Sequence, residues 1–203
     1  MAVPPTVFLV DDDPGARDSM RYLLESDGLA VRAFSSAREF LDAYDPGRPG
    51  CLVLDVRMPE LDGLELQQKL GARGDHLPII FVTGYGNVPT CARAMKAGAI
   101  DFLEKPVDHD TLLSLVYKGL DQDVARHEQK RQRQEVDRRI ASLTEREREV
   151  MQFLYQGKSL KQIAVRLGIS VQTAAKHRIK VLRKLNVDGE TELVRLLMVR
   201  SLQ

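Results

Sequence analysis

Acidic side chains gather at two places in the first third of the chain. Asp11, Asp12 and Asp13 follow one short apolar run, and Asp55 ends another. Carboxylates that meet at one place repel each other unless a cation joins them, and Mg²⁺ is the hard, oxygen-preferring ion that suits such a cluster. Asp13 stands directly before Pro14, which is the pattern of a helix N-cap followed by proline at the first helical position. The alternative for Asp11 and Asp12 is that they only cap the same helix.

Two further polar residues stand at the ends of apolar runs. Thr83 ends one run, and Lys105 follows another and directly precedes Pro106. A phosphoryl group on Asp55 would need a cation and a hydroxyl donor for its oxygens, and these two residues supply both. A Lys-Pro step at such a place commonly holds a special loop geometry, with a cis peptide bond as one form. The simpler alternative for Lys105 is a salt bridge to the acidic residues.

The first 120 residues alternate short β-branched runs with helical patterns, which predicts an α/β domain with a parallel sheet and helices on both faces. Ligands bind such sheets beyond the carboxyl ends of the strands, where the strand order reverses, so both acidic groups should point into one crevice. The expected strands are Thr6–Val10, Ala30–Phe34, Cys51–Asp55, Ile79–Thr83 and Ile100–Leu103. The expected helices are Pro14–Ser26, Ala37–Tyr44, Gly63–Leu70, Val88–Ala97 and one that begins near His109.

The charge of the chain is unevenly distributed. The net charge of +1 divides into −7 over residues 1–121 and +8 over residues 122–203. A basic half is suited to binding a polyanion and an acidic half to binding a cation. The alternative is that the basic residues only form a solvated surface. The apolar runs are too short to span a bilayer and the first ten residues do not resemble a signal peptide, so we expect a cytoplasmic protein without a membrane partner. Cys51 and Cys91 are expected in the core rather than in a disulfide or metal site.

The middle of the chain is strongly polar. Residues 121–139 contain no Gly or Pro and only three apolar residues, a composition that cannot form its own core but favours a helix. We therefore expect a helical charged linker, residues 122–141, between a first domain of residues 1–121 and a second of residues 142–203. The alternative is a flexible tether. Val136, Ile140 and Leu143 recur at i, i+4 and i+7, which predicts a short apolar stripe near the end of this segment.

The last 62 residues predict a separate all-α domain of four helices. The expected helices run from Glu145 to near Gly157, from Ser159 to Gly168, from Ser170 to about Leu185, and from Glu190 to Leu202. The expected core consists of Leu143, Val150, Phe153, Leu154, Ile163, Ala164, Leu167, Ile169, Val181, Leu182, Leu185 and Leu193.

A short helix, a glycine-containing turn and a capped third helix form a helix-turn-helix, whose third helix enters the major groove of DNA. Basic side chains there bond phosphates or guanine, and Gln172 suits adenine. The expected DNA contacts are Lys161, Gln172, Thr173, Lys176, His177, Arg178, Lys180 and Arg183.

The motifs of the first domain resemble the receiver-domain signature of two-component response regulators over roughly residues 5–120. They are Val10–Asp13, Leu54–Pro59, Asp62–Gly63, Phe81–Gly84 and Phe102–Pro106. The resemblance implies a flavodoxin-like, five-stranded sheet of order 2-1-3-4-5 in which a histidine kinase phosphorylates Asp55. It further implies that Asp12, Asp55 and the backbone carbonyl of Arg57 ligate Mg²⁺ (or Mn²⁺), with Asp11 holding a metal-bound water. Thr83 and Phe102 would be a switch pair, and Lys105 would pair with a phosphoryl oxygen.

The second domain resembles the LuxR-type helix-turn-helix domain through Leu143–Val150, Gly157–Ala164, Leu167–Ser170 and Lys184–Val187. The whole chain thus resembles the FixJ/NarL class of response regulators, most of all the FixJ-type branch. This implies a phosphorylation-dependent transcription regulator, more often an activator. It also implies promoter DNA, RNA polymerase and a second copy of the chain as partners. Ala175 stands where the family often has a base-facing lysine, which leaves the exact base contacts open.

Three other functions are compatible with parts of the pattern. An aspartate-nucleophile phosphatase would carry D-x-D-x-[TV] after the first strand, whereas Gly15 stands at the closing position here. A receiver fold that no longer accepts phosphate would not need the full set of acidic, hydroxyl and lysine residues, and a stand-alone receiver would not need the basic half. Beyond self-phosphorylation and slow self-dephosphorylation, we expect no enzymatic activity.

Overall fold

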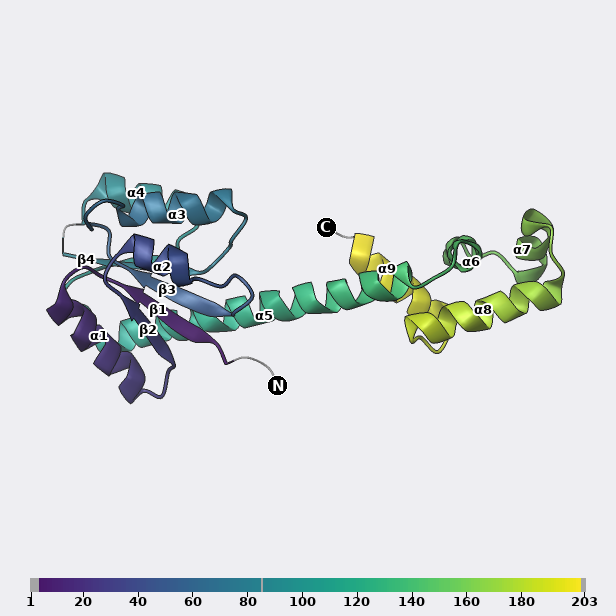
Figure 1. The fold of residues 1–203 in the computed structure, drawn as a ribbon, viewed down its shortest axis with the longest axis horizontal. Coiled ribbons are helices and arrows are strands. Elements are labelled where there is room, and N and C mark those ends of the chain that lie inside the picture. The colour runs from purple at the N-terminus through teal and green to yellow at the C-terminus, as the bar shows by residue number, and fades with distance from the viewer. Residues whose placement is uncertain (1–3, 85, 202–203) are drawn as a thin grey trace. The chain divides into compact units, whose positions relative to one another are not determined.

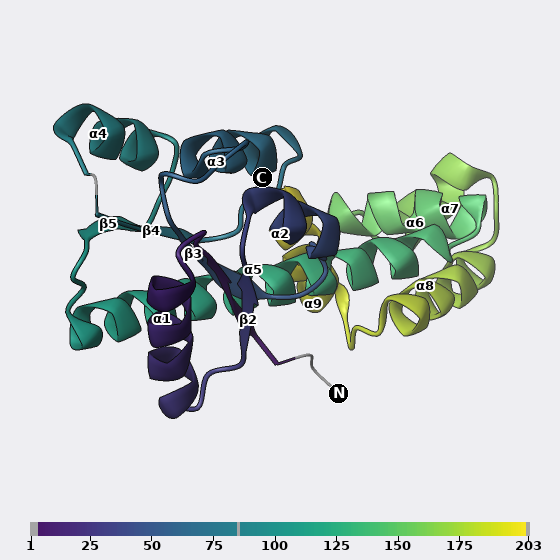
Figure 2. The same ribbon diagram turned by 60° about the vertical axis from the view of Figure 1, so that its left-hand side comes forward.

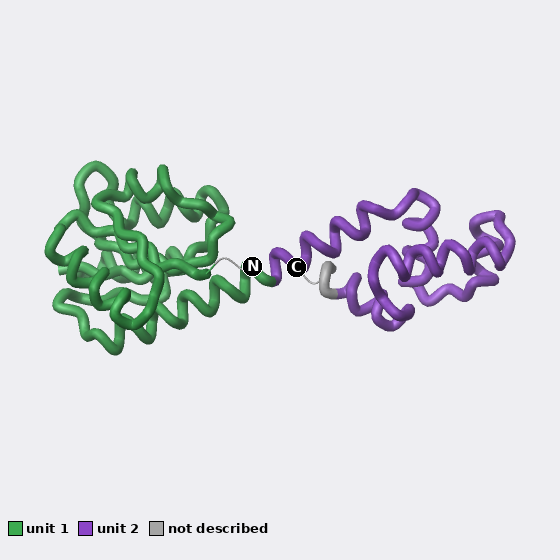
Figure 3. The backbone as a smooth tube through the Cα atoms, turned by 60° about the horizontal axis from the view of Figure 1, so that its bottom comes forward, with its two compact units in different colours: residues 1–128 green, residues 129–203 purple. Residues whose placement is uncertain are grey.

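The computed structural model describes residues 4–84 and 86–201 of the chain. These residues belong to two compact units, Met1–Glu128 and Gln129–Gln203, which Figure 3 shows in different colours. The division falls inside the polar segment expected to be a linker, so the second unit includes the last turns of that segment.

Five parallel strands form the sheet of the first unit in the order β2-β1-β3-β4-β5 (Figures 1 and 2). This confirms the expected doubly wound fold, and the expected strands agree with the observed ones to within one residue at each end. β1, β3 and β4 are buried over their whole length, as strands covered on both faces should be. The strands are β1 Thr6–Val10, β2 Val31–Phe34, β3 Gly50–Leu54, β4 Ile79–Thr83 and β5 Asp101–Glu104.

Helices cover both faces of this sheet, with α1 and α5 on one side and α2, α3 and α4 on the other (Figures 1 and 2). Alternate strand residues point to opposite faces and fill two apolar layers. Phe8 and Phe81 belong to the layer under α2 and α3, whereas Val7 and Ile80 belong to the layer under α1 and α5. The helices of this unit are α1 Pro14–Ser26, α2 Ala37–Ala43, α3 Gly63–Ala72, α4 Val88–Lys96 and the first part of α5.

Caps define where the helices nearest the carboxyl ends of the strands begin. The side chain of Asp13 accepts hydrogen bonds from the backbone N–H groups of Gly15 and Ala16, as expected for the N-cap of α1. Asp62 and Glu65 form a reciprocal capping box at the start of α3. The loops between strands and helices therefore leave the sheet in defined directions at the edge where the other acidic residues stand.

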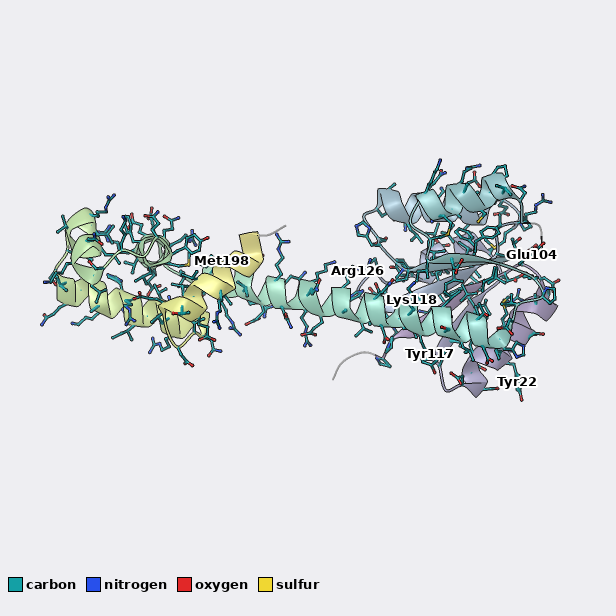
Figure 4. The ribbon with its side chains drawn as sticks, turned by 180° about the vertical axis from the view of Figure 1, so that it is seen from behind. Tyr22, Glu104, Tyr117, Lys118, Arg126 and Met198 are labelled. Atoms are coloured by element: carbon teal, nitrogen blue, oxygen red, sulfur yellow. The ribbon has the colours of Figure 1, made fainter. Side chains whose placement is uncertain are left out.

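Residues 109–141 form one helix, α5 (His109–Ala141), so the polar segment is helical in the structure. Within the first unit Asp123 of this helix is buried, and its Oδ2 accepts the backbone N–H of Gly50 at 2.8 Å. The same carboxylate is ion-paired with Arg126, which also donates to the carbonyl of His76. Figure 4 labels Arg126 on α5. These bonds tie α5 to the amino end of β3 and to the segment that leads into β4.

Four helices and the end of α5 form the second unit. The helices are α6 Glu145–Tyr155, α7 Leu160–Leu167, α8 Val171–Leu185 and α9 Glu190–Ser201. The expected end of the last helix at Leu202 lies outside the described residues. Thr144, Ser159 and Ser170 are the N-caps of α6, α7 and α8, and α7 ends at Gly168 in the left-handed region with φ 62°.

The core of the second unit contains every residue that the helical spacing predicts, with Phe153, Leu167 and Ile169 partly buried. It also contains Val136 and Ile140 from the end of α5. The apolar stripe expected there is thus covered by packing within the second unit. Buried members that the spacing does not predict include Met151, Ala174, Val187 and Leu197.

Two smaller findings complete the description. Within the described residues, no helix is both long enough and apolar enough to cross a membrane. Cys51 is buried in the sheet, as expected, whereas Cys91 on α4 is only partly buried, and both thiols are free.

Candidate functional site

Three carboxylates converge at the carboxyl ends of β1 and β3. Asp11 and Asp12 follow β1 and Asp55 follows β3, and ligand oxygens of the three lie within 4.8 Å of one another. Asp11 is fully buried and Asp55 is 8% exposed, whereas Asp12 is exposed to solvent. Asp11 is held in place because its Oδ1 accepts the backbone N–H of Asp13 at 3.0 Å. The alternative in which Asp11 and Asp12 only cap α1 does not describe this arrangement, because Asp13 alone caps the helix.

Lys105 lies between the carboxylates. Its Nζ is 2.7 Å from Asp11 Oδ2 and 4.0 Å from Asp55 Oδ1. The peptide bond that follows, Lys105–Pro106, is cis. Lys105 lies at the end of β5, so its ammonium reaches across the sheet edge from a third strand end. The arrangement places one positive charge beside two buried negative charges.

The carboxyl group of Asp55 has a raised pKa. Burial raises this pKa most, the charge of Lys105 opposes the rise, and the charge of Asp11 adds to it. Hydrogen bonds from the Thr83 hydroxyl and from the Val56 backbone N–H, the latter at 2.9 Å, also favour the charged form. Asp55 is thus a carboxylate that an added cation at this site would stabilise.

Thr83 and Phe102 lie on neighbouring strands next to the acidic cluster. Thr83 ends β4 and is fully buried, and β4 pairs with β5 so that Phe81 lies opposite Phe102. The partly buried ring of Phe102 packs against Phe81 with ring centroids 6.0 Å apart, and it also lies close to Gly86. Arg57 lies in the loop after β3 and is exposed to solvent. Every residue that the sequence assigns to the pocket therefore comes from this edge of the sheet.

The donor set of the pocket suits a magnesium ion. Mg²⁺ prefers oxygen ligands, few of them from the protein, and the three carboxylates offer such ligands within a span of 4.8 Å. The exposure of Asp12 leaves one side of the cluster open to water, which Mg²⁺ retains in most protein sites. The residues present fit this ion.

A second candidate site lies in the other unit. α7 and α8 are joined by the turn at Gly168, which gives the expected helix-turn-helix. Lys161 is exposed on α7 and lines a shallow depression of about 310 Å³ together with Lys158, Gln162, Val165 and Arg166. The sequence analysis did not select Lys158 or Arg166 as contacts, although both are basic residues on the first helix of the motif or just before it.

Most exposed side chains of α8 are polar, and most of these are basic; the apolar exceptions are Val171 and Ile179. Gln172, Lys176, Lys180 and Arg183 are exposed, whereas the buried side chains of α8, such as Val181, lie on the opposite face of the helix. α8 therefore presents a row of donors on the face that its own domain does not use.

Three expected contacts on α8, Thr173, His177 and Arg178, are only partly exposed. Thr173 belongs to the cap, because its backbone N–H and its hydroxyl both bond the hydroxyl of Ser170. Arg178 forms an ion pair with Glu190 at 2.8 Å. His177 is partly buried, and its Nδ1 has no hydrogen-bond partner within the described residues. Their side chains are less free to reach DNA than those of the exposed row.

Comparisons with known proteins agree with both sites. The family model of the response regulator receiver domain matches residues 7–117, and that of the bacterial regulatory proteins of the luxR family matches residues 141–197. The chain belongs to the response regulators with a LuxR-type DNA-binding domain. It is 45% identical to the transcriptional regulatory protein FixJ of Azorhizobium caulinodans over 95% of this chain and 92% of that protein. It is 40% identical to the response regulator protein TmoT of Ectopseudomonas mendocina over 93% of this chain and 86% of that one.

Solved structures give the same result. The low-resolution structure of the response regulator StyR matches with a TM-score of 0.92 at 43% identity, over 97% of this chain and 99% of that one. The FixJ-type branch expected from the sequence is therefore confirmed. This response regulator is a transcription regulator.

Proposed function

We propose that Asp55 is the phosphoryl acceptor of this response regulator and that phosphorylation controls binding of its second domain to promoter DNA. The observation that carries the proposal is the convergence of Asp11, Asp12, Asp55 and Lys105. Three carboxylates within 4.8 Å and an ammonium 4.0 Å from Asp55 Oδ1 form a site that can accept a dianionic group. The donor would be the phosphohistidine of a sensor kinase.

In the proposed reaction a carboxylate oxygen of Asp55 attacks the phosphorus atom. The new O–P bond forms as the N–P bond to the kinase imidazole breaks, and the released imidazole takes up a proton from water. Asp11, Asp12, Asp55 and the backbone carbonyl of Arg57 would hold Mg²⁺, with Mn²⁺ as a substitute, and the ion would neutralise charge on the transferring oxygens. Positioning and charge neutralisation supply most of what phosphoryl transfer requires.

Lys105 and Thr83 would receive the new group. Lys105 already lies beside Asp11 and Asp55, so its ammonium can pair with a phosphoryl oxygen with little movement. The hydroxyl of Thr83 would donate to another oxygen, and Phe102 would change its packing as Thr83 moves. Hydrolysis of the acyl phosphate by water would reset the protein slowly.

The second half of the proposal concerns DNA. α8 would lie in the major groove, with Gln172, Lys176, Lys180 and Arg183 as its main contacts and Lys161 on the backbone. Thr173, His177 and Arg178 would not be main contacts. They would contribute through the cap of α8 and through the packing of α8 within its domain. Because the partner would be chromosomal DNA, we expect the protein to act in the cytoplasm.

We propose residues 1–121 as the receiver domain, 142–203 as the DNA-binding domain, and 122–141 as the helical segment between them. Promoters read by helix-turn-helix proteins usually contain two half-sites, so we propose a homodimer that phosphorylation strengthens. As an activator, it would also contact RNA polymerase.

Capture of genomic DNA fragments by the full-length protein tests this function. We expect beryllofluoride, a stable phosphoryl mimic, to increase the recovery of a discrete set of fragments with the wild type. The Asp55→Asn variant should recover the same set weakly and without a response to beryllofluoride. Equal recovery by wild type and Asp55→Asn in both conditions would contradict the proposed control by Asp55.

A further inference from the structure

Ile179 is an apolar side chain on the exposed face of the DNA-binding helix. It is 61% exposed in the middle of α8, whereas the large apolar residues that follow it on this helix, Val181, Leu182 and Leu185, are buried in the core of the domain. Ile179 is not a member of that core, whose α8 residues include Ala174, Val181 and Leu185. Packing within the domain therefore does not account for it.

Ile179 lies on the same exposed face of α8 as the polar side chains expected to contact DNA. Successive residues of an α-helix are about 100° apart, so Ile179, Gln172, Arg183 and Lys176 fall within an arc of about 60°. The buried residues Ala174, Val181 and Leu185 fall on the other side. All four side chains of the arc thus point away from the domain. The isoleucine stands at one end of the arc, with Gln172 and Arg183 next to it on one side and the partly buried Ala175 on the other.

A single exposed apolar residue on a protein surface usually has no function, because apolar atoms make up much of every surface. Ile179 differs because it belongs to an exposed arc whose other three members, Gln172, Arg183 and Lys176, are all hydrogen-bond donors. If this face enters the major groove, each of its side chains meets base edges or phosphates. Isoleucine cannot form hydrogen bonds with these polar groups, and it would displace water from them without replacing the lost bonds. The side chain therefore fits this position only if an apolar group of the DNA faces it.

The major groove presents one such group. The C5-methyl of thymine is the apolar feature by which base pairs differ there, while the other edges offer donors and acceptors. We propose that Ile179 contacts the methyl group of a thymine and thereby makes that base pair a fixed position of the operator half-site. The inference rests on the proposed DNA-binding function and adds a base preference to it. Lys176 and Arg183, on the same face of α8, would bond phosphates or guanine.

The test begins with a selection of duplexes from a random-sequence pool by the full-length protein with beryllofluoride. Each thymine of the enriched duplex is then replaced in turn by deoxyuridine, which removes only the methyl group. We expect one replacement per half-site to weaken wild-type binding about four-fold, the factor that corresponds to burying one methyl group. In Ile179→Ala the same replacement should have almost no effect, because the contact is already absent.

Two variants serve as controls. Ile179→Val keeps a branched side chain and should retain most of the uracil penalty. Met198→Ala removes another exposed apolar side chain, 49% exposed on α9 (Figure 4), and should keep the full penalty. Thermal unfolding of each variant checks that the domain remains folded.

The outcomes separate this inference from the function on which it rests. Enriched duplexes with a uracil-sensitive thymine that becomes insensitive in Ile179→Ala would support the inference. Enriched duplexes in which no thymine is sensitive, or in which the sensitivity is equal in Ile179→Ala, would overturn it and leave DNA binding intact. A wild-type selection without any enriched duplex would overturn both.

Discussion

The Glu147→Gln substitution removes a buried charge from the first turn of α6. The side chain of Glu147 is 5% exposed, and its Oε2 accepts Lys184 Nζ at 2.6 Å and the backbone N–H of Thr144 at 2.9 Å. Glutamine retains an oxygen for Thr144 and nearly the same shape. The substitution therefore deletes the charged bond between α6 and the last turn of α8, with the capping box kept.

The loss of this bond should destabilise the second unit by about 2 kcal/mol. A hydrogen bond between charged groups contributes about 1.5–3 kcal/mol, and we expect the lower half of that range because Lys184 is 30% exposed and can be solvated again. Lys184 also keeps its bond to the carbonyl of Ser142 at 3.0 Å. About 2 kcal/mol corresponds to roughly 30-fold more frequent opening of the helices.

The effect depends on pH in a defined direction. The hydrogen bond from Lys184, followed by that from the Thr144 backbone N–H, lowers the pKa of Glu147 from 4.5 to about 2. A carboxyl whose pKa is lower in the folded state stabilises the fold above its unfolded pKa and loses that contribution as the pH falls toward the folded value. The difference between wild type and Glu147→Gln should thus be full at neutral pH and should shrink below pH 4.5.

Hydrogen exchange measured by mass spectrometry on the full-length protein is the appropriate assay, because it reports α6 and α8 separately from the receiver. Peptides from residues 145–155 and 171–185 should lose protection about 30-fold in Glu147→Gln. The matched control is Glu145→Gln, an exposed residue of the same turn, for which we expect about 0.5 kcal/mol through the helix dipole alone. Equal loss of protection in both variants would refute the assignment of a stabilising pair to Glu147 and Lys184.

Two further predictions concern α5 and the DNA-binding helix. Asp123→Ala should destabilise the first unit by about 1–3 kcal/mol in urea unfolding, because it leaves the buried N–H of Gly50 without its acceptor, whereas Arg126 is 39% exposed and can be solvated again. Asp121→Ala, an exposed neighbour, should change stability little, and similar effects of the two would contradict this account. Lys180→Ala should weaken binding to all duplexes alike and reduce the slope of log affinity against log salt by about one, whereas Lys118→Ala on the receiver should leave that slope unchanged. A slope unaltered in Lys180→Ala would exclude a phosphate contact there.

Much of the fold follows from local pattern. The alternation of β-branched runs with helical segments predicts the parallel sheet, because strands covered on both faces must be apolar throughout, and β1, β3 and β4 are. The pocket follows from the fold in turn. Parallel strands end at one edge, so Asp11, Asp55 and Lys105 meet there although up to 94 residues separate them.

The remaining features depend on tertiary contacts that leave no periodic signal. Asp123 bonds Gly50 across 73 residues, and a single buried acid on a polar helix looks like any solvated residue in the sequence. The pairing of Arg178 with Glu190 likewise joins two helices that the sequence shows only as charged. The sequence also does not show where the second unit begins. Val136 and Ile140 pack with α6 to α9, but two apolar residues in a polar segment do not indicate which core they join.

The identity of the phosphorylated residue is the most direct test of the proposed mechanism. The full-length protein is treated with acetyl phosphate and Mg²⁺, and the mass of the intact protein and of its peptides is measured. We predict the addition of one phosphoryl group, located on Asp55, that disappears in Asp55→Asn and is reduced in Asp12→Ala or when Mg²⁺ is chelated. Labelling of Asp55→Asn at the wild-type level, or a phosphoryl group on another residue of the wild type, would contradict the account.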